Sequence, residues 1–205
     1  MTSMSDEGFR TLHALRIKGF ASTATVAELA SVPIDVAEHR LRDLAARELA
    51  MFREARSLWQ LTPAGREHHA EQLAADREAA DVGALRESYG AFLGLNERFK
   101  VLCGEWQLRD GEPNDHADAG YDAGVVAKLV ALDGDARPIV DELGRAVPRL
   151  EPYSARLADS CAKVVGGDQR MFTGVMCGSY HDVWMELHED LILTQGIDRA
   201  KEGSF

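Results

Sequence analysis

The segment 12–65 constrains the fold of this chain most, because its apolar pattern changes there from helical to strand-like spacing. Apolar residues first recur at intervals of three and four over residues 5–19, which predicts a helix. Two short helices are expected next, opened by capping sequences at residues 25–28 (TVAE) and 35–38 (DVAE). Two short capped helices separated by a turn predict a helix-turn-helix.

Two strand-like runs follow these helices, at residues 49–52 and 57–61, and the turn 53–56 between them is expected to form a wing. Thr62 is placed to cap the next helix, and Pro63 stands at its first position, where the missing N–H costs nothing. That helix is expected to run to about residue 80. Residues 1–80 therefore predict a winged helix-turn-helix domain of the α+β type.

The rest of the chain, residues 81–205, predicts a second domain that is an all-helical bundle, so the protein as a whole is expected to be mostly α. Residues 81–83 mark the expected boundary between the domains. Residues 110–120 are rich in Asp, Gly, Asn and Pro and are expected to form a mobile loop. Helices are expected at residues 85–106, 121–132, 135–147 and 150–165, with a last one capped by Ser179 and ending near residue 195.

The net charge of −11 is spread unevenly over the two predicted domains. Residues 1–80 hold 10 basic and 12 acidic residues, whereas residues 81–205 hold 13 basic and 22 acidic residues. Proteins gain affinity for DNA by neutralising phosphates, so the second domain is not expected to contact nucleic acid. DNA contacts in the first domain would need clustered arginines.

Several features of the sequence favour a protein of a reducing cytoplasm. No run approaches the roughly 18 to 20 apolar residues that span a bilayer, so no membrane association is expected. The first residues lack a basic segment followed by an apolar core, so export is not expected. Cys103, Cys161 and Cys177 are odd in number and widely separated, which argues against a disulfide framework or a zinc module.

Motifs in the first 75 residues carry a resemblance to a known family. They are the capped second helix, Leu41-x-x-Leu44 followed by the basic Arg47, and the closing sequence LTPAGR at residues 61–66. In these features the segment resembles the winged-helix domain of MarR-type transcription regulators. Glu48 stands where that family usually has a glycine, so this turn is expected to be built differently. The layout of the whole chain is also similar to GntR-type regulators with an all-helical effector domain.

The resemblance implies double-stranded DNA as a partner, bound by a homodimer with the third helix of each copy in the major groove. Early exposed residues of that helix would face base edges, and the wing arginines would contact phosphate or the minor groove. The predicted DNA-binding residues are Val36, Glu38, His39, Arg42, Arg53 and Arg56. As an alternative, Asp35 and Glu38 only cap the helix, and their carboxylates repel phosphates.

A pocket between helices of the second domain is expected to receive a small-molecule effector. Asn96 lies on an otherwise apolar helical stripe, and several aromatic side chains could line a cavity near it. The predicted ligand-binding residues are Asn96, Phe99, Trp106, Tyr153, Trp184 and His188. As an alternative, the same side chains simply fill the core.

No catalytic residue, metal site or cofactor is expected. The sequence lacks the GxGxxG, P-loop, HExxH and GxSxG motifs. Ionisable groups do gather between His181 and Asp190, but His181 and His188 are about 10 Å apart along a helix, too far to share one metal. The carboxylates of Asp182, Glu186 and Asp190 have the spacing of a solvated acidic face.

The sequence therefore predicts a DNA-binding transcription regulator whose helical domain senses a small molecule or a partner. The alternative is a protein–protein adaptor that uses the winged helix and the acidic helical domain as interfaces. An enzyme acting in the helical domain is the third class, motivated only by the cluster at residues 181–190.

Overall fold

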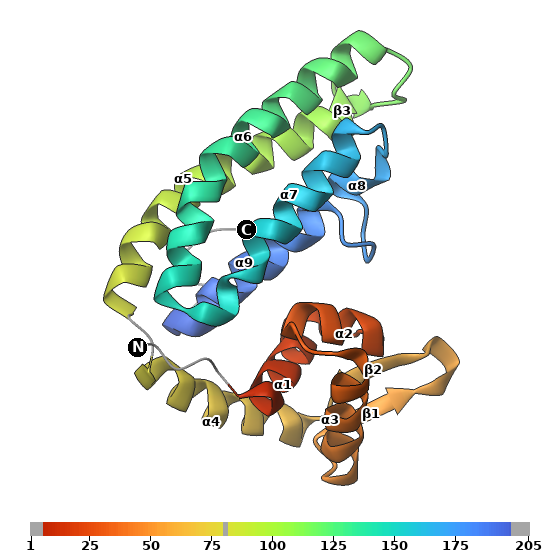
Figure 1. Ribbon diagram of the computed structural model, residues 1–205. Coiled ribbons are helices and arrows are strands. Elements are labelled where there is room, and N and C mark those ends of the chain that lie inside the picture. The colour runs from red at the N-terminus through yellow and green to blue at the C-terminus, as the bar shows by residue number, and fades with distance from the viewer. Residues whose placement is uncertain (1–5, 80–81, 198–205) are drawn as a thin grey trace.

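The structure is a computed structural model that describes residues 6–79 and 82–197, and it is mostly helical (Figure 1). Figure 1 shows an N-terminal lobe, built from α1 to α4 with a hairpin, and a C-terminal lobe, built from α5 to α9. The N-terminal lobe contains α1 (Glu7–Lys18), α2 (Thr23–Ala30), α3 (Ile34–Ala46), β1 (Ala50–Arg53), the 3-10 turn η1 (Glu54–Arg56), β2 (Leu58–Leu61) and α4 (Pro63–Ala79).

The C-terminal lobe consists of helices with one minimal hairpin. Its elements are α5 (Val82–Gln107), β3 (Leu108–Arg109), β4 (Glu112–Pro113), α6 (Ala119–Ala146), the 3-10 turn η2 (Pro148–Leu150), α7 (Pro152–Val165), α8 (Arg170–Thr173) and α9 (Tyr180–Gln195). The boundary predicted at residues 81–83 begins at Asp81, which lies outside the described residues. Each lobe has its own hydrophobic cluster, and Leu29 of α2 packs against both.

The two-stranded sheet of the N-terminal lobe is antiparallel, with Phe52 of β1 opposite Trp59 of β2. Trp59 fixes the base of the hairpin to the α1–α2 connection. Its backbone N–H donates to the Ala21 carbonyl at 2.8 Å, and its indole Nε1 donates to Thr23 Oγ1 at 3.1 Å. The tip of the hairpin, residues 53–57, is exposed and projects from the lobe.

Two helix starts differ from the prediction. The cap of α2 is Ser22, whose Oγ accepts from the Thr25 N–H at 3.1 Å, so Thr25 lies inside the first turn. The helix starts early because the hairpin holds Ala21 extended just before it. Helix α3 starts after Pro33 without a side-chain cap, and Asp35 lies in its first turn, where a negative charge favours the helix dipole.

The junction from α3 through β1 to α4 depends on the backbone of Glu48 and on the side chain of Thr62. Glu48 has a φ of 60°, so it adopts the left-handed conformation, and the expectation of a different turn was wrong. The turn closes α3 through a hydrogen bond from the Leu49 N–H to the Leu44 carbonyl at 2.8 Å. The predicted cap at Thr62 is confirmed, because its Oγ1 accepts from the Gly65 N–H at 3.0 Å and donates to the Glu48 carbonyl at 2.7 Å.

In the C-terminal lobe, the expected helices at residues 121–132 and 135–147 are one continuous helix, α6, with Pro138 inside it. Tertiary packing explains why the helix continues through the expected break. Leu132, Ala136 and Val140 are buried on both sides of the expected break, so packing outweighs the local preference of Gly134 and Pro138 to end a helix. Figure 1 shows α6 lying along α5 over most of its length.

The segment expected to be a mobile loop, residues 110–120, instead holds the turn and second strand of the β3–β4 hairpin and a polar network. Asn114 Nδ2 donates to the Trp106 carbonyl and to Asp122 Oδ1, each at 3.1 Å. His116 Nδ1 lies 3.0 Å from Asp122 Oδ2. Side-chain hydrogen bonds thus tie this polar segment to both α5 and α6. The short helix α8 was not predicted, whereas Ser179 caps α9 as expected, its Oγ accepting from the Asp182 N–H at 3.1 Å.

Candidate functional site

The six residues predicted to contact DNA all lie on α3 and at the end of the β1–β2 hairpin. Figure 1 shows α3 on the part of the N-terminal lobe that is remote from the C-terminal lobe, and the hairpin projecting sideways from the lobe. Five of the side chains are exposed, and Val36 is half-buried. The predicted surface is therefore accessible. The five exposed side chains are those of Glu38, His39, Arg42, Arg53 and Arg56.

On α3, basic side chains already have acidic neighbours. Arg42 Nη2 lies 2.5 Å from Glu38 Oε1, and His39 Nε2 lies 3.4 Å from Asp43 Oδ2. Exposed pairs of this kind contribute about 0–1 kcal/mol, so a phosphate can displace the carboxylate at little cost. The face of α3 is nonetheless close to neutral as it stands.

The hairpin tip differs from α3 in its charge. Arg53 and Arg56 are both exposed, and among the described residues neither forms an ion pair with a carboxylate. Both guanidinium groups can therefore meet a phosphate without first breaking a salt bridge. With Glu54 between these two arginines, the tip carries a formal net charge of +1.

A buried charged cluster joins the two lobes, and the sequence did not reveal it. We call it the junction cluster and define it as His13 (α1), Asp76 (α4), Arg149 (η2) and Asp190 (α9). Arg149 donates to Asp76 Oδ2 at 3.0 Å and also to Asp190. His13 Nε2 lies 3.0 Å from Asp190 Oδ1. Four elements from both lobes thus meet at one guanidinium and two carboxylates.

Burial alone would raise the pKa of Asp190, but the neighbouring Arg149 and His13 outweigh it and hold this pKa well below its usual range. His69 of α4 lies 2.9 Å from His13, from Nε2 to Nδ1. Burial and the proximity of His13 lower the pKa of His69 to about 3, so His69 is neutral at neutral pH. His13 Nδ1 therefore shares a hydrogen bond with His69, whereas His13 Nε2 lies beside the Asp190 carboxylate without meeting hydrogen-bond geometry.

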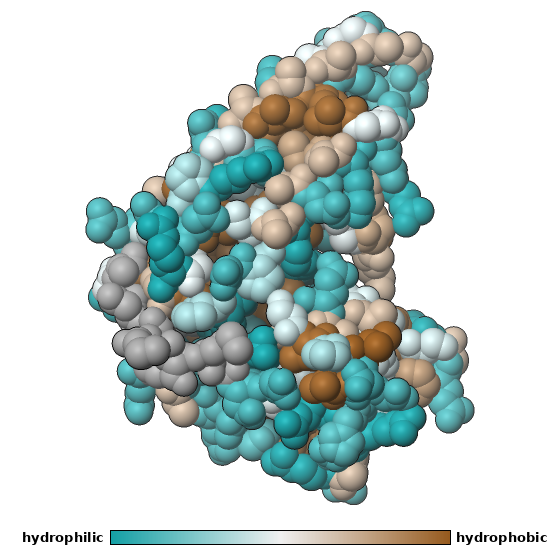
Figure 2. Space-filling view, viewed as in Figure 1, coloured by the Kyte–Doolittle hydropathy of each residue, from teal (hydrophilic) through white to brown (hydrophobic). Residues whose placement is uncertain are grey.

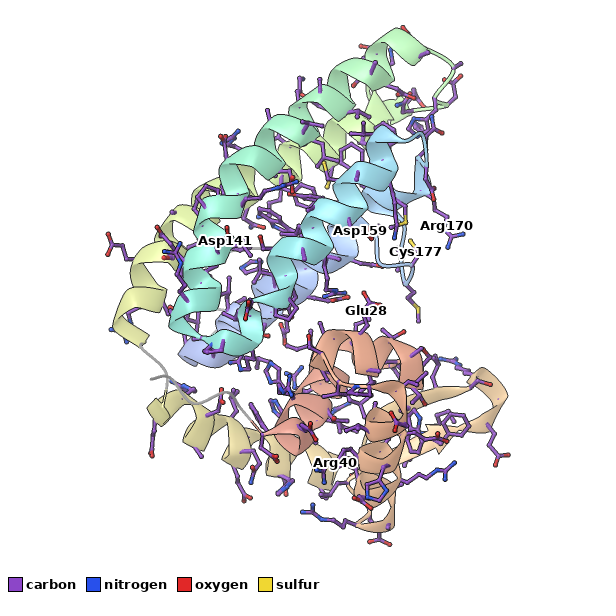
Figure 3. The ribbon with its side chains drawn as sticks, in the orientation of Figure 1. Glu28, Arg40, Asp141, Asp159, Arg170 and Cys177 are labelled. Carbon is purple, nitrogen blue, oxygen red and sulfur yellow. The ribbon has the colours of Figure 1, made fainter. Side chains whose placement is uncertain are left out.

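A second set of ion pairs flanks the junction cluster. Glu186 of α9 lies 2.5 Å from Lys18 Nζ of α1 and 2.7 Å from Arg156 Nη1 of α7. Arg156 also reaches Glu28 of α2 at 3.4 Å, and Figure 3 shows Glu28 between the lobes. The pairs Lys18–Glu186 and Arg156–Glu28 thus link the N-terminal lobe to α9 and α7 of the C-terminal lobe.

The carboxylate row of α9 is therefore not the solvated face that its spacing indicated. Glu186 and Asp190 are buried against the N-terminal lobe, and Asp190 is only 1% exposed. Asp182 Oδ2 accepts from the backbone N–H of Cys177 at 2.8 Å and of Gly178 at 3.0 Å. The row holds the lobes together and orders the loop before α9.

The side chains predicted to line a ligand pocket do not share one cavity. Asn96 Oδ1 accepts from Trp184 Nε1 at 2.9 Å, and Phe99 packs on the same indole with ring centroids 4.9 Å apart. His188 is buried near the same group, whereas Trp106 packs elsewhere, on Phe172 and His116. These residues fill the core, as in the alternative interpretation. The sixth residue, Tyr153, does line a cavity between the lobes.

Two cavities lie where the lobes meet, and Figure 2 shows the surface notched there. The first, of about 640 Å³, lies between α1 and α2 on one side and α6, η2 and α7 on the other. The second, of about 600 Å³, lies between the α1–α2 connection and the segment before α9. Phe20 and Met176, both exposed, face this second cavity from opposite lobes. Pockets of this size accommodate small organic molecules.

Two of the three thiols, those of Cys103 and Cys161, show no sign of nucleophilic activation. Burial raises the pKa of Cys103 to about 12, and burial with the nearby Asp133 raises that of Cys161 to about 11. Both groups are therefore protonated at neutral pH. Within residues 6–79 and 82–197, no group of three His, Cys, Asp or Glu side chains is placed to hold a metal ion.

No helix of the described chain combines the length and apolar character needed to cross a bilayer. Comparison with models of protein families, with curated proteins and with solved structures finds no match to this chain. The geometry of the molecule is therefore the basis for any functional assignment.

Proposed function

We propose that this protein is a cytoplasmic DNA-binding transcription regulator, in which the N-terminal lobe is a winged helix-turn-helix and the C-terminal lobe controls its orientation. The observation that carries the proposal is the joint exposure of α3 and the arginine-bearing hairpin tip on the side of the molecule that the C-terminal lobe leaves uncovered. A fold with those two elements exposed side by side can insert a helix in the major groove and reach the flanking phosphates.

The dimensions and chemistry of α3 suit this role. Its 13 residues span about 20 Å, and its exposed side chains are short or flexible enough to enter a major groove. Arg42 would exchange Glu38 for a base edge or a phosphate, and Arg53 and Arg56 would contact the backbone beside the groove. A second copy of the chain would present a second α3, which gives a homodimer two half-sites.

A protein–protein adaptor is the second candidate, and one observation favours it. The same surface exposes two large apolar side chains, Ile34 at 59% and Phe52 at 44%, next to charges that are already paired. An apolar patch with neutralised charges fits a protein partner better than a phosphate backbone.

Removing the arginines of the hairpin tip distinguishes a DNA-binding regulator from a protein–protein adaptor. In an anisotropy titration of a short mixed-sequence duplex at low salt, the double variant Arg53→Ala, Arg56→Ala is expected to bind more weakly than the unmodified chain. The slope of log affinity against log salt should fall by about 2, because two phosphate contacts are lost.

The matched control is Arg86→Ala, Arg145→Ala, which removes two exposed arginines from the C-terminal lobe and leaves the net charge equal to that of the test variant. It should bind like the unmodified chain. Equal loss in both double variants, or no retention of DNA by any of them at low salt, would reject the proposed function.

A further inference from the structure

The larger interlobe cavity is bounded by both lobes, so a molecule bound there would contact each of them. Its N-terminal wall comes from α1 and α2, and its C-terminal wall from η2 and α7 with one turn of α6. Much of the lining is apolar and consists of small or rigid side chains. These apolar residues are Ala14, Leu29, Ala30, Pro148, Pro152, Ala155 and Ala158.

Three guanidinium groups line the cavity, and two of them are committed to other partners. Arg149 belongs to the junction cluster and is bonded to Asp76 and Asp190. Arg137 donates two hydrogen bonds to Asp133 Oδ2, at 2.9 and 2.8 Å. Both guanidinium groups are thus held against carboxylates, which weakens their attraction for a further anion.

Arg10 of α1 carries the third guanidinium, and part of its hydrogen-bonding capacity is unused. Its Nη1 donates to the Ser31 carbonyl at 3.3 Å, while its buried Nε has no hydrogen-bond partner among the described residues. Arg10 forms no ion pair within the described part of the chain. An unsatisfied charged donor at the wall of a cavity is costly, and a carboxylate is the group that a planar guanidinium binds best.

The opposite wall limits the charge that the ligand can carry. The carboxyl groups of Asp141 and Glu151 line the cavity and are exposed. A second negative group on the ligand would approach these carboxylates and be repelled. The lining therefore selects one negative charge on an otherwise apolar molecule.

We propose that this cavity binds a small monocarboxylate with an apolar body, its carboxylate on Arg10 and its body against Leu29 and the small side chains of α7. The bound molecule contacts both lobes and so stabilises one orientation of α3 relative to the C-terminal lobe. This regulatory consequence rests on the proposed DNA-binding function. The binding itself does not.

Binding is tested on the intact chain by calorimetry without DNA, using phenylpropionate and octanoate, each beside its neutral amide, and phenyl phosphate as a dianion. Both acids are expected to bind saturably, and the amides and the phosphate ester more weakly. Arg10→Gln should weaken the acids at least about tenfold, since charge-assisted hydrogen bonds are lost. Arg40→Gln, which replaces a half-buried arginine of the same lobe that does not line the cavity, is the control and should bind normally.

Absence of saturable binding by both acids, equal binding of acid and amide, or unchanged affinity in Arg10→Gln would overturn the carboxylate site. None of these outcomes bears on whether the chain binds DNA. The duplex titration repeated with and without saturating acid then measures the coupling, which should appear as a change in duplex affinity in the unmodified chain and vanish in Arg10→Gln. An unchanged affinity in a chain that binds both DNA and the acid would overturn the regulatory part alone.

Discussion

Replacing Arg149 by methionine is expected to lower the free energy of unfolding by about 3–5 kcal/mol, because it leaves the buried carboxylate of Asp190 without its guanidinium. Asp190 is 1% exposed, and water cannot replace the lost guanidinium there. Methionine has a similar length and keeps the apolar packing of the arginine stem. The loss of stability therefore measures the effect of removing the positive charge. Denaturant unfolding at neutral pH measures it.

The pH dependence of that loss identifies its cause. In the unmodified chain the pKa of Asp190 is depressed, so its pairing stabilises the fold above its unfolded pKa, near 3.9, and is lost only below that value. In Arg149→Met the Asp190 carboxyl keeps His13 as a neighbour but loses its guanidinium, which raises its pKa, so the loss of stability should shrink as the pH falls from 7 to 5. Arg145→Met, an exposed arginine of α6, should change stability little. A loss of stability no greater in Arg149→Met than in Arg145→Met would contradict the role given to the junction cluster.

Gly65→Ala is expected to destabilise the N-terminal lobe by about 3 kcal/mol, because a methyl group there has no space. A Cβ built on Gly65 lies 1.9 Å from the Leu49 carbonyl oxygen, and that oxygen accepts the Thr62 N–H at 3.0 Å. The overlap is with backbone, so no side-chain rotation can relieve it. Thermal unfolding followed by circular dichroism provides the measurement.

The control substitution for Gly65→Ala is expected to change stability in the opposite direction. Gly90 lies exposed in the interior of α5, and a Cβ built there meets nothing within 4 Å. Gly90→Ala should therefore stabilise the chain by about 0.5–1 kcal/mol through helix propensity. Equal effects of the two substitutions would show that α4 does not approach the Leu49 carbonyl as closely as described.

Elements whose signals are local were predictable from the sequence. Thr62 and Ser179 cap helices as expected, since a hydroxyl three residues before a backbone N–H needs no tertiary support. The hairpin and the order of the first four helices also follow the apolar pattern. Ser22 was missed as a cap because the hairpin, which is distant in sequence, holds the residue before it.

Whether a polar helix face is exposed or buried by another part of the chain could not be predicted from the sequence in the same way. Spacing places Asp182, Glu186 and Asp190 on one face of α9 but does not say that the N-terminal lobe lies over it. A signal was present, since α9 carries apolar side chains on its other faces, and a helix apolar nearly all round is buried. Arg10 and Arg149 gave no comparable signal, because their roles depend on contacts across the lobes.

The central claim, sequence-specific recognition of DNA by α3 and the hairpin tip, is tested most directly by selection of duplexes from a randomised pool with the intact chain. We predict enrichment of one near-palindromic sequence with half-sites about 10 bp or a multiple apart. The enrichment should disappear in the double variant Arg53→Ala, Arg56→Ala and persist in Arg86→Ala, Arg145→Ala. A recovered pool indistinguishable in sequence from the input would contradict the claim.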